Sequence, residues 1–204
     1  MTRRSRRNKR IANQIRQLPW REVTNPYAPC EVLAQEQVDT IIETALELLA
    51  GQGMSFLDGA SRDLLRRAGA TVDGEIVRFD PDFVRETIAH APAEFGLRAR
   101  NPAHDLVIGG NRIVFSSVGG PAFCSDLDKG RRPGSYAEMC DYLKLVQSLN
   151  ILHQKGGVAF EALDLPATTR HLDLYLEQWR LLDKNCQAYA LGRERTVDAI
   201  EMAC

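Results

Sequence analysis

The sequence predicts an α/β fold: an incomplete (β/α)8 TIM barrel, with its first two βα units, preceded by a cap of helices and small antiparallel β elements. Helical and strand patterns alternate from residue 135 onwards, as they do in parallel α/β folds. Two short strands expected near residues 155 and 189 lie 34 residues apart, a usual βαβ spacing. Because a barrel of eight strands needs about 250 residues, we expect this 204-residue chain to be the N-terminal part of a longer one.

Residues 1–34 are expected to form a basic and largely irregular arm. Residues 1–21 contain eight Lys or Arg and no Asp or Glu, whereas the remaining residues carry 18 basic and 27 acidic side chains. Three prolines, Pro19, Pro26 and Pro29, interrupt any regular element. A solvated tail is the favoured interpretation of such an arm, and binding to nucleic acid or to an acidic partner surface is the alternative.

Residues 35–134 are expected to form the cap. Its first helix should span residues 35–49, because apolar residues recur there at helical spacing. A short helix at 61–68, a strand at 76–79 and a helix that begins at Asp80 and Pro81 should follow. The stripe expected to be buried on the first helix comprises Val38, Ile41, Ile42, Ala45 and Leu49.

The second half of the cap has the pattern of short strands, the first at residues 95–99. Gly109-Gly110-Asn111 is typical of a tight turn between two strands. Asp128-Lys129-Gly130 indicates a second turn. The two hairpins expected around these turns pair residues 105–108 with 112–115, and residues 122–127 with 131–133.

Residues 135–204 are expected to begin the barrel. Ser135 and Glu138 form the pattern of a capping box, in which each side chain hydrogen-bonds the backbone N–H of the other residue. Amphipathic periodicity then predicts helices, and short apolar runs predict strands. After the capped helix we expect a strand at 153–160, a helix at 167–182, a strand at 187–191 and a helix from Thr196.

The composition is that of a globular protein, with 44% hydrophobic and 26% charged residues. No apolar run approaches the roughly 18 residues that suggest a membrane span. The basic start is not followed by the apolar region of a secretory signal. We therefore expect a cytoplasmic protein without membrane attachment.

Several kinds of site are not indicated by the sequence. The five cysteines and four histidines show neither C-x-x-C nor H-E-x-x-H spacing, so no metal site or disulfide framework is expected. Paired glycines occur without the frame of a phosphate-binding loop. Asp126 and Asp128 flank a turn, where aspartate is favoured for backbone reasons.

The segment from Val114 to Phe123 is the most unusual part of the sequence. An apolar strand ends there in Gly119-Gly120-Pro121. Paired glycines followed by proline indicate a close approach of the backbone to something else. The segment is either a tight turn or bulge, or a loop that lines a ligand pocket.

In their order and spacing, these features resemble the N-terminal portion of the trimethylamine–corrinoid methyltransferase family, which includes glycine-betaine-type members without pyrrolysine. The resemblance covers residues 35–190, about three quarters of the chain. It is carried by Gly51–Phe56, Leu64–Gly74, Val77–Phe79, the Pro81 helix ending at Ala91-Pro92, Arg100–Pro102, Ile108–Gly110, Val118–Pro121, Asp126–Asp128, Gly130–Pro133 and the helix after Ser135.

The resemblance implies a (β/α)8 barrel that transfers a methyl group from a tertiary or quaternary amine to the cobalt of a separate corrinoid protein. The corrinoid (cobalamin) would be carried by that partner, with no cofactor or metal bound by this chain, and the full-length protein would be a homo-oligomer. Catalytic residues would lie beyond residue 204, so we expect the chain alone to be inactive. Barrel enzymes bind substrates at the carboxyl ends of their strands, where the pocket candidates are Phe115, Gly119, Gly120, Pro121, Gly156, Gly157, Tyr189 and Gly192.

Two other functions remain open from the residues alone. The chain could be a non-enzymatic α/β module that binds a partner through its basic arm or through an exposed strand edge. It could also belong to a different barrel enzyme, although no lysine or carboxylate pair in the sequence is typical of one. Nucleic acid is the less favoured partner in each case.

Overall fold

The computed structural model describes residues 15–28, 30–120, 122–157, 160–187 and 191–203. Contacts divide the chain into two compact units, one formed by Tyr27–Ala93 and the other by Met1–Pro26 with Glu94–Cys204. This division differs from the arm, cap and barrel boundaries at residues 34 and 134, which follow the sequence pattern. In the described ranges, no helix combines the length and the apolar character that crossing a bilayer requires.

The Tyr27–Ala93 unit places helices beside a small antiparallel sheet with the strand order β2-β4-β3. The start predicted at Asp80 is confirmed, because its side chain accepts hydrogen bonds from the N–H groups of Asp82 and Phe83. Val77, in the central strand, is fully buried. The elements of this unit are α2 (Gln35–Gly51), β2 (Met54–Ser55), α3 (Gly59–Arg67), β3 (Thr71–Asp73), β4 (Ile76–Arg78) and α4 (Pro81–Ala89).

The buried stripe expected on α2 is wrong in part. Leu46 is the buried residue of this helix, whereas Ile41 and Ile42 are 58% and 46% exposed, and Ala45 is also exposed. The helix packs on α4 and β4, so the face that carries Leu46 and the half-buried Leu49 is the one covered. The apolar periodicity predicted the helix correctly, but it assigned the buried face to residues on a neighbouring side of the helix.

Among its described residues, the second unit contains three antiparallel strand pairs, and one predicted hairpin is wrong. The strands flanking Gly109-Gly110-Asn111 do not pair with each other: β6 pairs with β5, and β7 pairs with β1 of the N-terminal arm. The hairpin predicted around residues 128–130 is confirmed. The elements are β1 (Val23–Thr24), β5 (Glu94–Leu97), the short 3-10 helix η1 (Pro102–His104), β6 (Leu106–Gly109), β7 (Arg112–Ile113), β8 (Phe123–Asp126) and β9 (Gly130–Pro133).

The capping box at Ser135 is confirmed at the start of α5 (Tyr136–Ser148). Glu138 also accepts a hydrogen bond from Arg132 Nε at 2.6 Å, and Arg132 reaches Asp126 at 2.6 Å. Hydrogen bonds from Arg132 and Ser135 lower the pKa of Glu138 to about 2. The cap therefore joins the β8–β9 hairpin to the helix as well as starting the helix.

We expect Glu138→Gln to lower the melting temperature at neutral pH and to make the melting temperature less dependent on pH in the acid range. A carboxylate whose folded-state pKa is about 2 stabilises the protein above its ordinary pKa of 4.5, and the stabilisation is lost as the pH falls toward 2. Melting temperatures between pH 2 and pH 7 would measure this. Glu47→Gln, at an exposed position of α2, should lose melting temperature with falling pH as the wild type does. If Glu138→Gln lost it in the same way, the Glu138 cap would not be the source of the pH dependence.

Three parallel segments lie side by side in this unit. β10 (Gln154–Lys155) pairs in parallel with β11 (Asn185–Cys186), and Ser116 forms a parallel bridge with Gln154 on the other side of β10. The Phe115 carbonyl accepts from His153 N–H at 2.9 Å, and Ser117 N–H donates to the Gln154 carbonyl at 3.3 Å. The strand predicted near 155 thus has a parallel neighbour, β11, which lies just before the strand predicted near 189, and residues 115–117 precede both in the same layer.

The predicted bounds of these strands are wrong. In the described ranges, β10 covers only Gln154–Lys155 of the predicted 153–160, and β11 lies at Asn185–Cys186, before the predicted 187–191. Residues 158–159 and 188–190 lie outside the described ranges. Polar residues at this position have internal partners: Lys184, just before β11, donates to the carbonyls of Val146 and Leu149, and Asn185 in β11 donates to that of Arg98. The parallel layer also begins at residue 115, before the expected boundary at 135.

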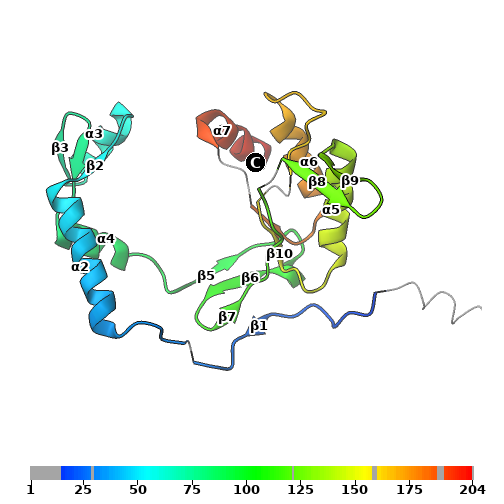
Figure 1. Cartoon of the computed structure of the whole chain (residues 1–204), viewed down its shortest axis with the longest axis horizontal. Coiled ribbons are helices and arrows are strands. Elements are labelled where there is room, and N and C mark those ends of the chain that lie inside the picture. Colours follow the sequence, from blue (N-terminus) through cyan, green and yellow to red (C-terminus); the bar gives the residue numbers. More distant parts are fainter. Residues whose placement is uncertain (1–14, 29, 121, 158–159, 188–190, 204) are drawn as a thin grey trace, which may run out of the picture. The chain divides into compact units, whose positions relative to one another are not determined.

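Helices cover one side of the parallel segments. α5 contacts β10 and packs against α6 (Arg170–Leu181), and α6 packs against α7 (Gly192–Ala203), which begins earlier than the Thr196 predicted. Figure 1 shows α5 and α6 beside the β10 ribbon. Two clusters of buried apolar side chains form the core between these elements: Met139, Phe160 and Leu174 in one, and Leu143, Val146 and Leu182 in the other.

Candidate functional site

The carboxyl ends of the three parallel segments form the candidate site. Parallel strands end at one edge of their layer, and ligands of α/β folds bind outside that edge. Ser117 is followed there by Val118 and Gly119, and β10 is followed by Gly156 and Gly157. A Cβ atom placed on Gly157 would lie 3.8 Å from the Cα atom of Gly119. The structure therefore brings together two of the predicted glycine pairs.

Hydrogen bonds fix the loop at this edge. Gly156 N–H donates to Ser117 Oγ at 3.1 Å, and Tyr142 Oη of α5 donates to the Val118 carbonyl at 2.9 Å. Burial raises the pKa of Tyr142, so its hydroxyl stays protonated and able to donate. The loop backbone is thus held by the neighbouring strand on one side and by a helix on the other.

Among the described residues, the remaining pocket candidates are not part of the Gly119–Gly157 contact. The Phe115 ring packs on the His153 ring, with centroids 5.7 Å apart. Gly120 has a φ of 132° and Gly192 a φ of 81°, with open space around both, so each allows a turn that other residues disfavour. Pro121 and Tyr189 lie outside the described residues. The pocket role of all eight candidates stays a prediction.

The sequence did not single out the buried Lys155 or the partly buried Cys186. They are register partners in the β10–β11 pair. Lys155 is 1% exposed and its Nζ donates to Gln178 Oε1 of α6 at 2.5 Å. Burial lowers the pKa of Lys155 to about 8 and raises the pKa of Cys186. A lysine followed by two glycines has the local pattern of a loop, so nothing nearby in the sequence indicates its burial.

A partly buried polar group, Asp183, lies at the opposite, amino edge of the layer. Asp183, just before β11, accepts hydrogen bonds from Gln147 Nε2 at 2.6 Å and from Asn101 Nδ2 at 3.2 Å, and His104 Nδ1 lies 2.9 Å away. Burial alone would raise the pKa of Asp183, but these partners hold it below its usual value. Polar groups at the amino edge of parallel strands commonly serve stability, and this one ties α5 to the loop before β6.

Two cavities adjoin the parallel layer. One, of about 340 Å³, lies between residues 15–23 of the arm and residues 149–153. The other, of about 440 Å³, lies beside β11 and is lined in part by Arg100, Trp179 and Cys186. Within the described ranges, no group of three or more His, Cys, Asp or Glu residues is arranged to hold a metal ion.

The comparisons with known proteins identify a family. A family model described as trimethylamine methyltransferase (MTTB) matches residues 1–204. The chain is 34% identical over 172 residues to a glycine betaine methyltransferase of Desulfitobacterium hafniense strain Y51, a match that covers 84% of this chain and 36% of the relative.

Two further relatives carry related names. A proline betaine:corrinoid methyltransferase of Eubacterium limosum is 27% identical, over 78% of this chain and 32% of the relative. A trimethylamine methyltransferase MttB of Desulfitobacterium hafniense strain DSM 10664 / DCB-2 is 30% identical, over 42% of this chain and 18% of the relative. The chain matches at most about a third of the length of these curated relatives.

Proposed function

Because this chain belongs to the trimethylamine methyltransferase (MTTB) family, we propose that it forms part of an enzyme that moves a methyl group from a methylated amine to the cobalt of a corrinoid protein. The observation that carries the proposal is the family match over residues 1–204. The corrinoid partner is supported by the name of the Eubacterium limosum relative. The proposed substrate is a quaternary amine of the glycine betaine type, because that relative is matched over the largest share of this chain.

The proposed fold is a (β/α)8 barrel, of which residues 115–117, β10 and β11 would be neighbouring staves. Their parallel order and the helices that follow them support this fold. In such a barrel the loops after the strands form the active site. The proposal therefore assigns Gly119, Gly156 and Gly157 to the wall of the site.

The chemistry of the reaction fits a site of this kind. A quaternary ammonium offers no hydrogen atom on nitrogen, so it is held by aromatic faces, each worth about 0.5–2 kcal/mol, and by charge. The cobalt of the partner is the attacking group, so the protein supplies position and excludes water. Glycines at the edge let the two loops pack closely, so that backbone atoms form the proposed wall.

The test is methyl transfer by the purified protein. Glycine betaine, proline betaine and trimethylamine would each be supplied with a corrinoid protein reduced to Co(I), and loss of the Co(I) absorbance together with formation of the demethylated amine would be followed. We expect a betaine to give the fastest transfer. Absence of transfer from all three amines by a protein that contains the family's full length would overturn the proposal.

A further inference from the structure

The N-terminal strap, defined here as residues 15–24, is held to the second unit mainly by polar contacts. Gln17 Nε2 donates to the Ser148 carbonyl at 2.9 Å, and Asn150 Nδ2 donates to the Leu18 carbonyl at 2.8 Å. Ile15 and Leu18 remain 70% and 73% exposed, and the strap and residues 149–153 line the 340 Å³ cavity together. Hydrogen bonds, the β1–β7 pairing and the packing of the Trp20 ring therefore hold the strap.

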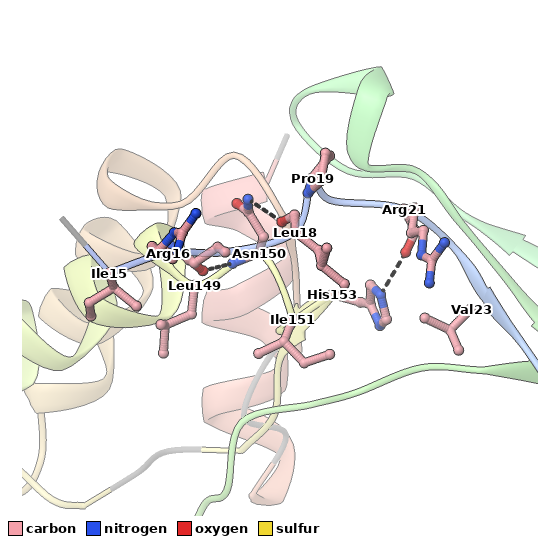
Figure 2. Close-up of a pocket in the computed structure, with 11 residues that line it drawn as sticks. Ile15, Arg16, Leu18, Pro19, Arg21, Val23, Leu149, Asn150, Ile151 and His153 are labelled. Carbon is pink, nitrogen blue, oxygen red and sulfur yellow. Dashed lines mark hydrogen bonds between the residues drawn. The ribbon is translucent and has the colours of Figure 1, made fainter. Parts of the chain in front are cut away.

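His153 provides a buried contact with the strap, and two hydrogen-bond partners set the roles of its ring nitrogens. Phe115 N–H donates to Nδ1 at 2.9 Å, so Nδ1 carries no proton. The proton must therefore be on Nε2, which donates to the Arg21 carbonyl at 3.0 Å. Figure 2 shows the ring directed at that carbonyl. His153 is 1% exposed, and the ring of Trp20 lies against it with centroids 5.8 Å apart.

The same histidine is connected to the candidate site through the backbone. Phe115, whose N–H meets His153, begins the segment that pairs with β10. Two residues later, Ser117 accepts the Gly156 N–H at the carboxyl edge. A change in the position of Phe115 is therefore transmitted along one short, hydrogen-bonded segment to the glycines of the site.

We propose that the strap is a latch for the candidate site: His153 joins the Arg21 carbonyl to Phe115, so that detachment of the strap loosens the Ser117–Gly156 contact. The inference concerns regulation of the proposed site, and in that sense it rests on the proposed function. The latch requires that the His153–Arg21 contact and the Ser117–Gly156 contact be coupled. This coupling can be measured without an assay of methyl transfer.

Two substitutions separate the roles of the ring nitrogens. The amide of His153→Asn reaches the position of Nδ1 and can accept from Phe115, but it falls short of Arg21. The amide of His153→Gln reaches the position of Nε2 and can donate to Arg21, but it leaves Phe115 unpaired. Residue-resolved amide hydrogen exchange of the whole chain would be read at Asn25, whose N–H bonds Asn111 beside the strap, and at Ser117 and Gly156.

The latch predicts that each variant speeds exchange at both ends, by about tenfold for one lost hydrogen bond. Independent contacts predict instead that His153→Asn affects Asn25 alone and that His153→Gln affects Ser117 and Gly156 alone, and this result would overturn the inference. His90→Gln, at an exposed position in the other unit, is the matched control. Unchanged exchange in α5 would show that the variants remain folded.

A third variant tests the coupling without altering His153. Trp20→Ala removes the ring that packs between His104 and His153, and we expect faster exchange at Ser117 and Gly156. No change at those two amides would overturn the latch. Failure of methyl transfer with exchange still coupled would instead refute the proposed function, because the exchange experiment contains neither amine nor corrinoid.

Discussion

Gly156→Ala is expected to destabilise the second unit by about 3 kcal/mol, near the upper end of what forcing extra atoms into a packed site costs. A Cβ atom at this position would overlap the carbonyl oxygen of Ser117 and approach its carbonyl carbon. These are backbone atoms of the neighbouring parallel segment, so no side-chain rotation can make room. The added methyl group must push the Phe115–Ser117 segment away from β10 and break the Gly156–Ser117 hydrogen bond. Urea unfolding followed by circular dichroism would measure the loss.

The adjacent glycine provides the matched control. A Cβ atom on Gly157 would make an ordinary contact, 3.8 Å from Gly119 Cα. Because alanine also restricts the unfolded chain, Gly157→Ala should leave stability within about 0.5 kcal/mol of the wild type. Equal stability of the two variants would mean that the three parallel segments are not packed as described. Loss of methyl transfer in Gly157→Ala, with stability retained, would support a place for this glycine in the site wall.

Local patterns in the sequence predicted two capped helix starts correctly. Asp80 and Ser135 are recognisable because the side chain that caps a helix lies within three residues of the N–H groups it binds. Paired glycines also indicated a close approach of backbones, which is observed between Gly157 and Gly119. Their use as a ligand pocket remains a proposal, because close packing of two loops requires glycine whether or not a ligand binds.

Contacts between distant residues account for what the sequence did not predict. The parallel segment at residues 115–117 was not predicted because it is defined by its pairing with Gln154, which lies 38 residues after Ser116. In the same way, β7 pairs with β1, which lies far away in the arm. Lys155 and Lys184 are polar residues in buried positions, and the pattern of apolar residues cannot reveal a side chain whose hydrogen-bond partner comes from another element. The contacts of His153 could not be predicted for the same reason, because its partners, Phe115 and Arg21, lie in distant segments.

Lys155→Met is expected to stabilise the protein at pH 7, contrary to the usual effect of removing a hydrogen-bonded residue. The pKa of Lys155 is lowered from 10.5 to about 8 by burial, so at pH 7 the folded protein holds a charged ammonium where water cannot reach it. The difference between the two pKa values corresponds to about 3 kcal/mol. Leaving Gln178 without its donor costs about 1–2 kcal/mol, so a net gain of about 1–2 kcal/mol remains.

The dependence on pH distinguishes this explanation from a simple change in packing. Between pH 8 and pH 10.5 the unfolded chain still binds the Lys155 proton while the folded protein has lost it, so the stability of the wild type rises with pH relative to the variant. The advantage of Lys155→Met should therefore shrink above pH 8 and become a deficit near pH 10.5, where only the lost hydrogen bond to Gln178 remains. Urea unfolding of both proteins across this range would measure the crossover.

Two further variants complete the test. Adding Gln178→Leu removes the unpaired amide oxygen and should increase the stability of Lys155→Met further, because both partners are then apolar. Lys144 is largely exposed and its pKa is raised by Asp141, so Lys144→Met should give no gain at pH 7 and a pH dependence of the opposite sign. Lys155→Met could instead lose the same amount of stability at pH 7 and at pH 10.5. The folded protein would then stabilise the Lys155 ammonium as well as water does, and burial would not lower the pKa of Lys155.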